Sequence, residues 1–181
     1  MTTTSTATRT YAIDPAHSDV SFAIRHLMLS KIRGAFHGLT GTITLGEGGD
    51  VPTKIAAEID VTSVDTQEAK RDGHLQAPDF FNSAEHTKMS FVSTSISGTG
   101  PTFTVNGNLT LRGVTKSVTL KGTVAGHVTD PWGNDRIGWS ATTSINRGDF
   151  GITFNQPLAT GGFMLGDDVD VTLEIQSIPA K

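Results

Sequence analysis

The chain alternates apolar and polar residues along several short segments, a pattern typical of β-strands with one buried face. The clearest example covers residues 108–120, where two alternating runs flank residues 112–117. Gly113 can adopt the backbone angles of a tight bend, so the segment predicts a hairpin or a sharply bent strand. Its apolar side must face an interior, and the content of that interior is the functional question.

Other segments predict further strands, because their apolar residues recur at every second position. We expect strands over residues 11–14, 18–26, 35–45, 54–61, 89–96, 103–111, 114–128, 137–145 and 168–178. Residues 67–75 give the only convincing helix, residues 130–134 a turn, and residues 150–163 an ambiguous, glycine-interrupted stretch. Many strands with one helical insert favour an antiparallel barrel or sandwich over a βαβ fold.

Length and composition narrow this picture to one globular domain. The 181 residues predict a single domain over 10–181, preceded by a disordered tail over 1–9. The net charge is −4 and no more than two basic residues are adjacent, which argues against a nucleic-acid surface. No apolar run is long enough for a secretory signal or a bilayer span, so we expect a cytoplasmic protein without stable membrane insertion.

Several stretches of the chain, which follow one another as they do in the family, resemble motifs of the YceI family of lipocalin-like, polyisoprenoid-binding proteins. They are NLTLRGVTKSVTL (108–120), IDPAHSDVSFAIRHL (13–27), RDGHLQAPDFF (71–81), INRGDFGI (145–152) and GDDVDVTLEI (166–175). The resemblance implies an all-β fold, an elongated antiparallel eight-stranded barrel that is open at one end and holds an isoprenoid chain. It also makes a homodimer plausible, although the sequence shows no distinct interface.

A barrel of this size holds either packed side chains or one slender ligand. The residues that we expect to line its interior are Phe22, Ile24, Phe36, Ile59, Phe80, Phe91, Leu109, Leu111, Val118, Trp139, Phe150 and Met164. Alternation alone favours simple core packing of these residues, and the family resemblance reverses that preference. Each buried CH₂ group contributes about 0.8 kcal/mol, so a prenyl chain needs no strong polar anchor.

Three polar residues of the helical insert, Arg71, Asp72 and His74, are candidates for the mouth of the barrel. The alternative is that Arg71 pairs with a carboxylate and fixes the insert to the barrel, and we prefer that reading. Arg147 and Asp149 pose the same choice, and we expect a structural ion pair there as well.

The sequence carries no recognised catalytic or metal-binding motif. The six His residues form no His-x-x-x-His pattern, Cys is absent, and no nucleophile elbow or phosphate loop occurs. We therefore expect no metal, no catalysis and no cofactor other than the ligand itself. The preferred function is binding, storage or transport of an isoprenoid lipid, either a polyprenyl chain or an isoprenoid quinone.

Two alternatives remain open at this point. The first is an enzyme that acts on a small apolar substrate, with Arg71, Asp72 or His74 as acid–base groups. The second is a ligand-free structural protein of the stress response with a fully packed core.

Overall fold

The computed structural model describes residues 7–181, in which strands predominate. The strands are β1 (Arg9–Ile13), β2 (Asp19–His26), β3 (Ser30–Phe36), β4 (Leu39–Leu45), β5 (Pro52–Asp60), β6 (Val64–Asp65), β7 (Lys88–Ser97), β8 (Thr102–Leu111), β9 (Val114–Thr129), β10 (Asp135–Asn146) and β11 (Leu165–Pro179). The helix is α1 (Ala69–Gln76), and the 3₁₀ turns are η1 (Pro15–His17), η2 (Val61–Ser63) and η3 (Arg147–Phe150). The described residues contain no helix with the length and apolar character needed to cross a bilayer.

Strand β1 closes the sheet because it pairs with two strands that are far apart in the sequence. It runs antiparallel to β4, with Tyr11 opposite Ile43, and to the end of β11, with Ala12 opposite Ile178. From β4 the order continues through β5, β7, β8, β9 and β10 to β11, and β2 and β3 extend the sheet beyond β11. Strand β1 leads into β2 and β3 leads into β4, so each of these two pairs counts as one strand of the wall. With β5, β7, β8, β9, β10 and β11 the wall has eight strands, and the predicted antiparallel barrel is confirmed.

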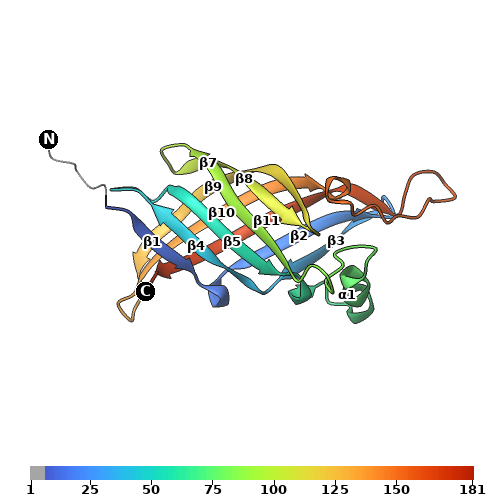
Figure 1. Ribbon diagram of the computed structural model, residues 1–181, viewed down its shortest axis with the longest axis horizontal. Coiled ribbons are helices and arrows are strands. Elements are labelled where there is room, and N and C mark those ends of the chain that lie inside the picture. The colour runs from blue at the N-terminus through green and yellow to red at the C-terminus, as the bar shows by residue number, and fades with distance from the viewer. Residues whose placement is uncertain (1–6) are drawn as a thin grey trace.

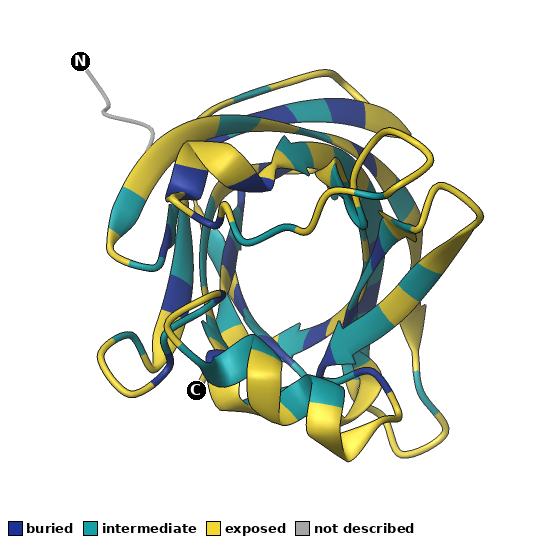
Figure 2. Ribbon diagram, turned by 90° about the vertical axis from the view of Figure 1, so that its right-hand side faces the viewer, coloured by how far each residue is buried: buried dark blue, intermediate teal, exposed yellow. Residues whose placement is uncertain are grey.

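The barrel is elongated, and its two ends differ (Figure 1). One end carries α1, the turn between β2 and β3, and residues 151–164; we call it the helix end. The other end carries the turn between β9 and β10 and the C-terminus; we call it the far end. Helix α1, predicted over residues 67–75, lies along one side of the strand ring at the helix end (Figure 2).

Residues 35–45 do not form the single strand that the alternation predicts. The strand ends at Phe36 and resumes at Leu39, because side-chain and turn contacts bind the intervening backbone. The backbone N–H groups of His37 and Gly38 donate to Ser63 Oγ, at 3.1 and 3.0 Å. Of the predicted N-terminal tail, Arg9 belongs to β1 and pairs with Leu45, and residues 1–6 lie outside the described residues.

Aromatic rings on the inner wall lie over glycines of neighbouring strands. A Cβ atom on Gly107 of β8 would lie 2.3 Å from Cζ of Phe91, and a Cβ on Gly122 of β9 would lie 2.4 Å from Cε2 of Phe103. Phe22 has the same relation to Gly34, at 2.5 Å. The glycines let the rings lie against the wall instead of projecting into the interior.

Charged groups connect the elements of the far end. Arg136 donates from Nη1 to Asp14, at 2.8 Å, and from Nε to Asp130 in the β9–β10 turn, at 2.9 Å. These bonds hold the pKa values of both carboxyls below their ordinary value. Tyr11 donates to Asp135 at 2.6 Å, and Trp139 donates from its indole nitrogen to the carbonyl of Asp50 at 2.8 Å.

We predict that Gly107→Val destabilises the barrel by about 1–3 kcal/mol, because the new side chain displaces the Phe91 ring. Gly126→Val on β9 is the control, since a Cβ at Gly126 meets no atom within 4 Å. Urea unfolding of both variants measures the difference. Equal stability of the two variants would contradict the role assigned to Gly107.

We also predict that Arg136→Met lowers the unfolding free energy at pH 7 and that this deficit shrinks as the pH falls below about 4. A carboxyl whose pKa is lowered on folding stabilises the protein above its ordinary pKa of 3.8 and loses that contribution as the pH falls through the lowered value. Urea unfolding at pH 7 and pH 3 tests this, with the exposed Lys121→Met as control. A deficit that is independent of pH would refute the assignment.

Candidate functional site

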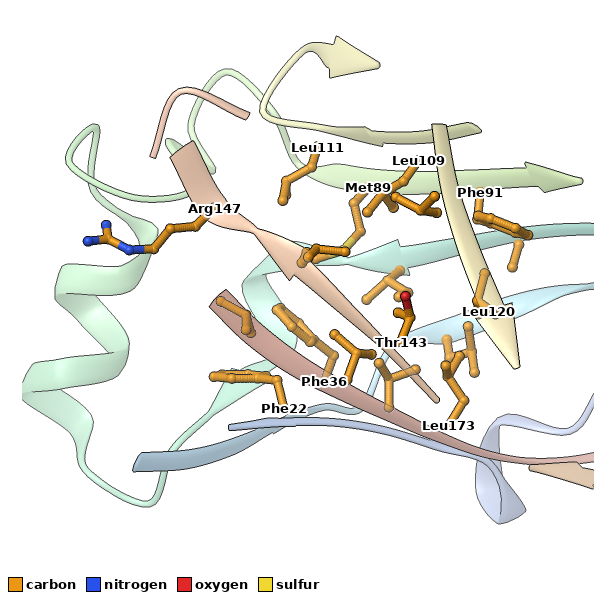
Figure 3. A pocket seen from close by; sticks show the side chains of 18 of the residues that line it. Phe22, Phe36, Met89, Phe91, Leu109, Leu111, Leu120, Thr143, Arg147 and Leu173 are labelled. Carbon is orange, nitrogen blue, oxygen red and sulfur yellow. The ribbon is translucent and has the colours of Figure 1, made fainter. Parts of the chain in front are cut away.

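The barrel encloses a cavity of about 420 Å³ with a predominantly apolar lining. Alternate residues of several wall strands line this cavity, as Val20, Phe22 and Ile24 of β2 do. Figure 3 shows side chains from opposite walls, including Phe36 and Leu120, converging on this space. The volume falls within the range of about 300–1,000 Å³ found for pockets that bury a drug-sized ligand.

The lining residues are buried towards the far end of the cavity and more exposed towards the helix end, which we call the mouth. Ile13, Ile43 and Trp139 line its far part and are buried in the core. At the helix end the lining includes Met164, which is partly exposed, and His74, which is exposed.

The structure places all of the predicted lining residues except one on the cavity. Those on it are Phe22, Ile24, Phe36, Ile59, Phe80, Phe91, Leu109, Leu111, Val118, Trp139 and Met164. Phe150 is the exception: it belongs to η3, outside the strand alternation, and its fully buried side chain packs into the core. The period-two argument does not extend to a 3₁₀ turn, which explains this error.

The three polar residues of the insert have separate positions. Arg71 and His74 line the cavity, whereas Asp72 does not. Asp72 Oδ1 accepts hydrogen bonds from the backbone N–H and hydroxyl of Thr66, at 2.8 and 2.6 Å, so it fixes α1 to the chain after β6. His74 lies 2.9 Å from an Asp79 carboxylate oxygen and packs edge-on against the ring of Phe80.

Arg71 does fix the insert, but not through the carboxylate that we expected. Its Nε donates to the hydroxyl of Thr66 at 2.7 Å and its Nη2 to the Thr66 carbonyl at 2.8 Å. The same hydroxyl donates to Asp72, so Thr66 connects the two charged side chains without a direct ion pair between them. Arg71 also belongs to the lining of the cavity at the mouth.

Arg147 forms no ion pair with Asp149, contrary to the prediction. Its side chain is 4% exposed, and three backbone carbonyls hold it: Nε donates to Gly166, and Nη1 to Ile152 and Phe154, at 2.8 to 3.1 Å. Burial lowers the pKa of Arg147 from its ordinary value, and the charge of Asp167 opposes that shift. Nη2 has no protein acceptor among residues 7–181.

The buried guanidinium lies at the helix end of the cavity and is directed towards α1 (Figure 3). The mouth therefore carries two cationic side chains, Arg71 and Arg147, together with the imidazole of His74. Such a group of donors can bind an electron-rich oxygen atom, since each guanidinium nitrogen is a hydrogen-bond donor only.

Sequence reasoning missed part of the lining. Leu120 and Leu173 follow the same alternation as the predicted residues and could have been found from it. Arg147 could not, because nothing in its neighbouring sequence shows that a charged side chain turns inwards. Within residues 7–181, no group of three or more His, Asp or Glu side chains is arranged to hold a metal ion.

A closed antiparallel barrel around an apolar cavity defines a lipocalin-like fold. The model of the YceI-like domain matches residues 11–177, and the chain belongs to this family. It is 37% identical to the protein YceI of Escherichia coli over 94% of this chain and 87% of the relative. The identity to YceI of Salmonella newport is 36%, over 99% and 92% of the two chains.

Solved structures of similar proteins share the fold. BcnA of Burkholderia cenocepacia superposes with a TM-score of 0.77 at 22% identity, over 91% of this chain and 98% of that one. The YceI protein of Campylobacter jejuni superposes with a TM-score of 0.74 at 29% identity, over 93% and 96%. A polyisoprenoid-binding domain of Saccharophagus degradans superposes with a TM-score of 0.69 at 16% identity, over 94% and 98%.

We predict that Arg147→Met lowers the unfolding free energy by at least about 2 kcal/mol, because three buried or half-buried backbone carbonyls lose a charged donor. Arg147→Lys should lose a large part of the same stability, since an ammonium group lacks the planar fork. Arg33→Met, at an exposed position of β3, is the control. Urea unfolding of the three variants tests this, and an Arg147→Met variant as stable as Arg33→Met would contradict it.

Proposed function

We propose that the protein binds an isoprenoid lipid, either a polyprenyl chain or an isoprenoid quinone, and stores or transports it. The observation that carries the proposal is the apolar cavity inside the barrel, which is lined mainly by aliphatic and aromatic side chains. A fully packed core, one of the alternatives, does not account for this space. The similarity to a polyisoprenoid-binding domain from Saccharophagus degradans supports the same ligand class.

The energetics favour a long apolar ligand over a polar one. The cavity wall offers few polar groups, so hydrogen bonding gives little affinity along the barrel. A five-carbon isoprene unit contributes roughly 4 kcal/mol of gross burial energy, at about 0.8 kcal/mol per carbon. Association costs about 4–15 kcal/mol, so a few units suffice for binding.

The orientation of the ligand follows from where the charges lie. Because Arg71, His74 and Arg147 all lie at the helix end, a polar head group is best accommodated there and the prenyl tail lies towards Trp139. The oxygen atoms of a phosphate or a quinone are suitable acceptors for the free nitrogen of Arg147.

The geometry favours binding over catalysis. Arg71 and Asp72, two of the candidate acid–base groups, are both bonded to Thr66, and His74 is bonded to Asp79. These bonds orient the side chains as supports for the insert.

Two variants of neighbouring residues test the proposal. Ala141 of β10 lines the cavity, and the adjacent Thr142 is exposed on the outer face. Ala141→Phe should fill the lumen and weaken binding of a prenyl lipid by at least about tenfold, whereas Thr142→Phe, which adds the same ring outside, should bind normally.

The measurement is mass spectrometry of lipid extracted from the purified protein, before and after incubation with a prenyl quinone and a polyprenyl phosphate. We expect one prenyl lipid to co-purify with, or load into, the wild type and the Thr142→Phe variant. Absence of any prenyl lipid after incubation, or equal loading of Ala141→Phe, would refute the proposal.

A further inference from the structure

Two segments at the helix end bring exposed apolar side chains together. Leu27, Met28 and Leu29 form the turn between β2 and β3 and are 37%, 64% and 81% exposed. Phe163, 58% exposed, lies in the segment between η3 and β11. The segments touch, since the N–H of Leu27 donates to the carbonyl of Met164 at 2.7 Å and Met28 lies against Gly162. We call Leu27, Met28, Leu29 and Phe163 the apolar tip.

The apolar tip carries no charge. Neither residues 26–30 nor residues 150–166 contain Asp, Glu, Lys or Arg. Charged residues of both signs flank the two segments in the sequence: Arg25, Lys31, Arg33, Asp149, Asp167, Asp168 and Asp170. One of these cations is matched directly, because Lys31 pairs with Asp170 at 2.8 Å. The surface therefore suits an apolar partner, with little net electrostatic attraction.

The backbone of the turn indicates that its apolar side chains have a role outside the fold. Leu27 and Met28 have φ angles of 54° and 59°, in the left-handed region that Gly, Asn and Asp occupy most easily. Bulky apolar residues there carry a conformational cost. The packing of the monomer does not offset it at Met28, which is mostly exposed.

The apolar tip borders the opening of the cavity. His26 precedes the turn and Met164 follows Phe163, and both line the cavity. Figure 1 shows the two segments projecting beyond the barrel at the helix end. An apolar surface beside the mouth contacts whatever medium supplies the ligand. A prenyl lipid, the ligand proposed above, is held in bilayers, since water does not dissolve it.

We propose that the apolar tip inserts into the surface layer of a phospholipid bilayer and brings the mouth of the cavity against the lipid. The membrane association is peripheral and reversible, because four side chains bury far less area than a spanning segment. Insertion does not depend on anionic lipid or on low salt. The lipid-transfer role rests on the proposed function, whereas binding to the bilayer does not.

Fluorescence locates the insertion. The chain has no Cys, so a single Cys at Leu29→Cys can carry an environment-sensitive dye, and Trp132→Cys serves as the control. Trp132 is 83% exposed in the β9–β10 turn at the far end. Phosphatidylcholine vesicles without prenyl lipid should shift the emission of the Leu29→Cys label to the blue and leave the Trp132→Cys label unchanged. No shift at Leu29→Cys, or equal shifts at both, overturns the proposal.

Flotation with the same vesicles measures the binding. Leu29→Ser combined with Phe163→Ser should reduce the bound fraction by at least about tenfold, since two large apolar side chains are removed, whereas Trp132→Ser should not. Met28→Gly relieves the left-handed strain, so it should unfold at the same or a higher temperature and still bind vesicles less well. Binding equal to the wild type in both tip variants overturns the proposal.

Two further readouts separate the alternatives. Neither Leu29 nor Phe163 lines the cavity, so loading with a prenyl quinone from detergent should be unchanged in the double variant, and transfer from vesicles should be slower. Failure of loading in all variants contradicts the proposed function and leaves vesicle binding as an independent result. A dimer of the wild type in sedimentation that the double variant abolishes assigns the apolar tip to a second copy and overturns the bilayer proposal.

Discussion

The pairing of β1 with both β4 and β11 is the constraint on which the other features depend. A closed sheet directs every second side chain into one space, and the wall strands supply apolar residues at those positions. Without closure, the same residues would line an open trough and would need a second layer to cover them. The charged contacts of Arg136 and the Tyr11–Asp135 bond connect the elements of the far end and stabilise the closure there.

The polar groups along the barrel and those at the mouth of the cavity have different hydrogen-bond partners. Along the barrel, hydroxyls such as that of Thr143 are occupied by the backbone; Thr143 Oγ1 donates to the carbonyl of Thr119 at 2.8 Å. At the mouth, Arg147 is fixed by backbone carbonyls and forms no hydrogen bond to a carboxylate of the described residues. The wall can therefore hold apolar atoms without competing hydrogen bonds, and the mouth keeps a donor for a polar group.

The sequence predicted the features that follow from strand periodicity and missed those that depend on turns. The strand positions of Phe22, Leu109 and Val118 were correct because alternation alone determines which side of a sheet a residue faces. Phe150 was misjudged because η3 has a different period. Arg147 was misjudged because two of the carbonyls that hold it, those of Ile152 and Phe154, come from residues 150–163, whose conformation the sequence left ambiguous. The break at His37 and Gly38 depends on Ser63, a partner distant in sequence. The apolar tip carries no periodic pattern at all.

The glycines beneath the aromatic rings set the width of the cavity. At each of the Phe22–Gly34, Phe91–Gly107 and Phe103–Gly122 pairs, the backbone of the neighbouring strand sets how close to the axis the ring must lie. At Gly122 the three nearest atoms to an added methyl group all belong to the Phe103 ring, so the methyl group would displace that ring. At Gly107 the methyl group would also lie 2.7 Å from the backbone carbonyl oxygen of Val92, so the wall itself would have to shift. The width of the interior is therefore set residue by residue, at the positions where a ring lies over a glycine.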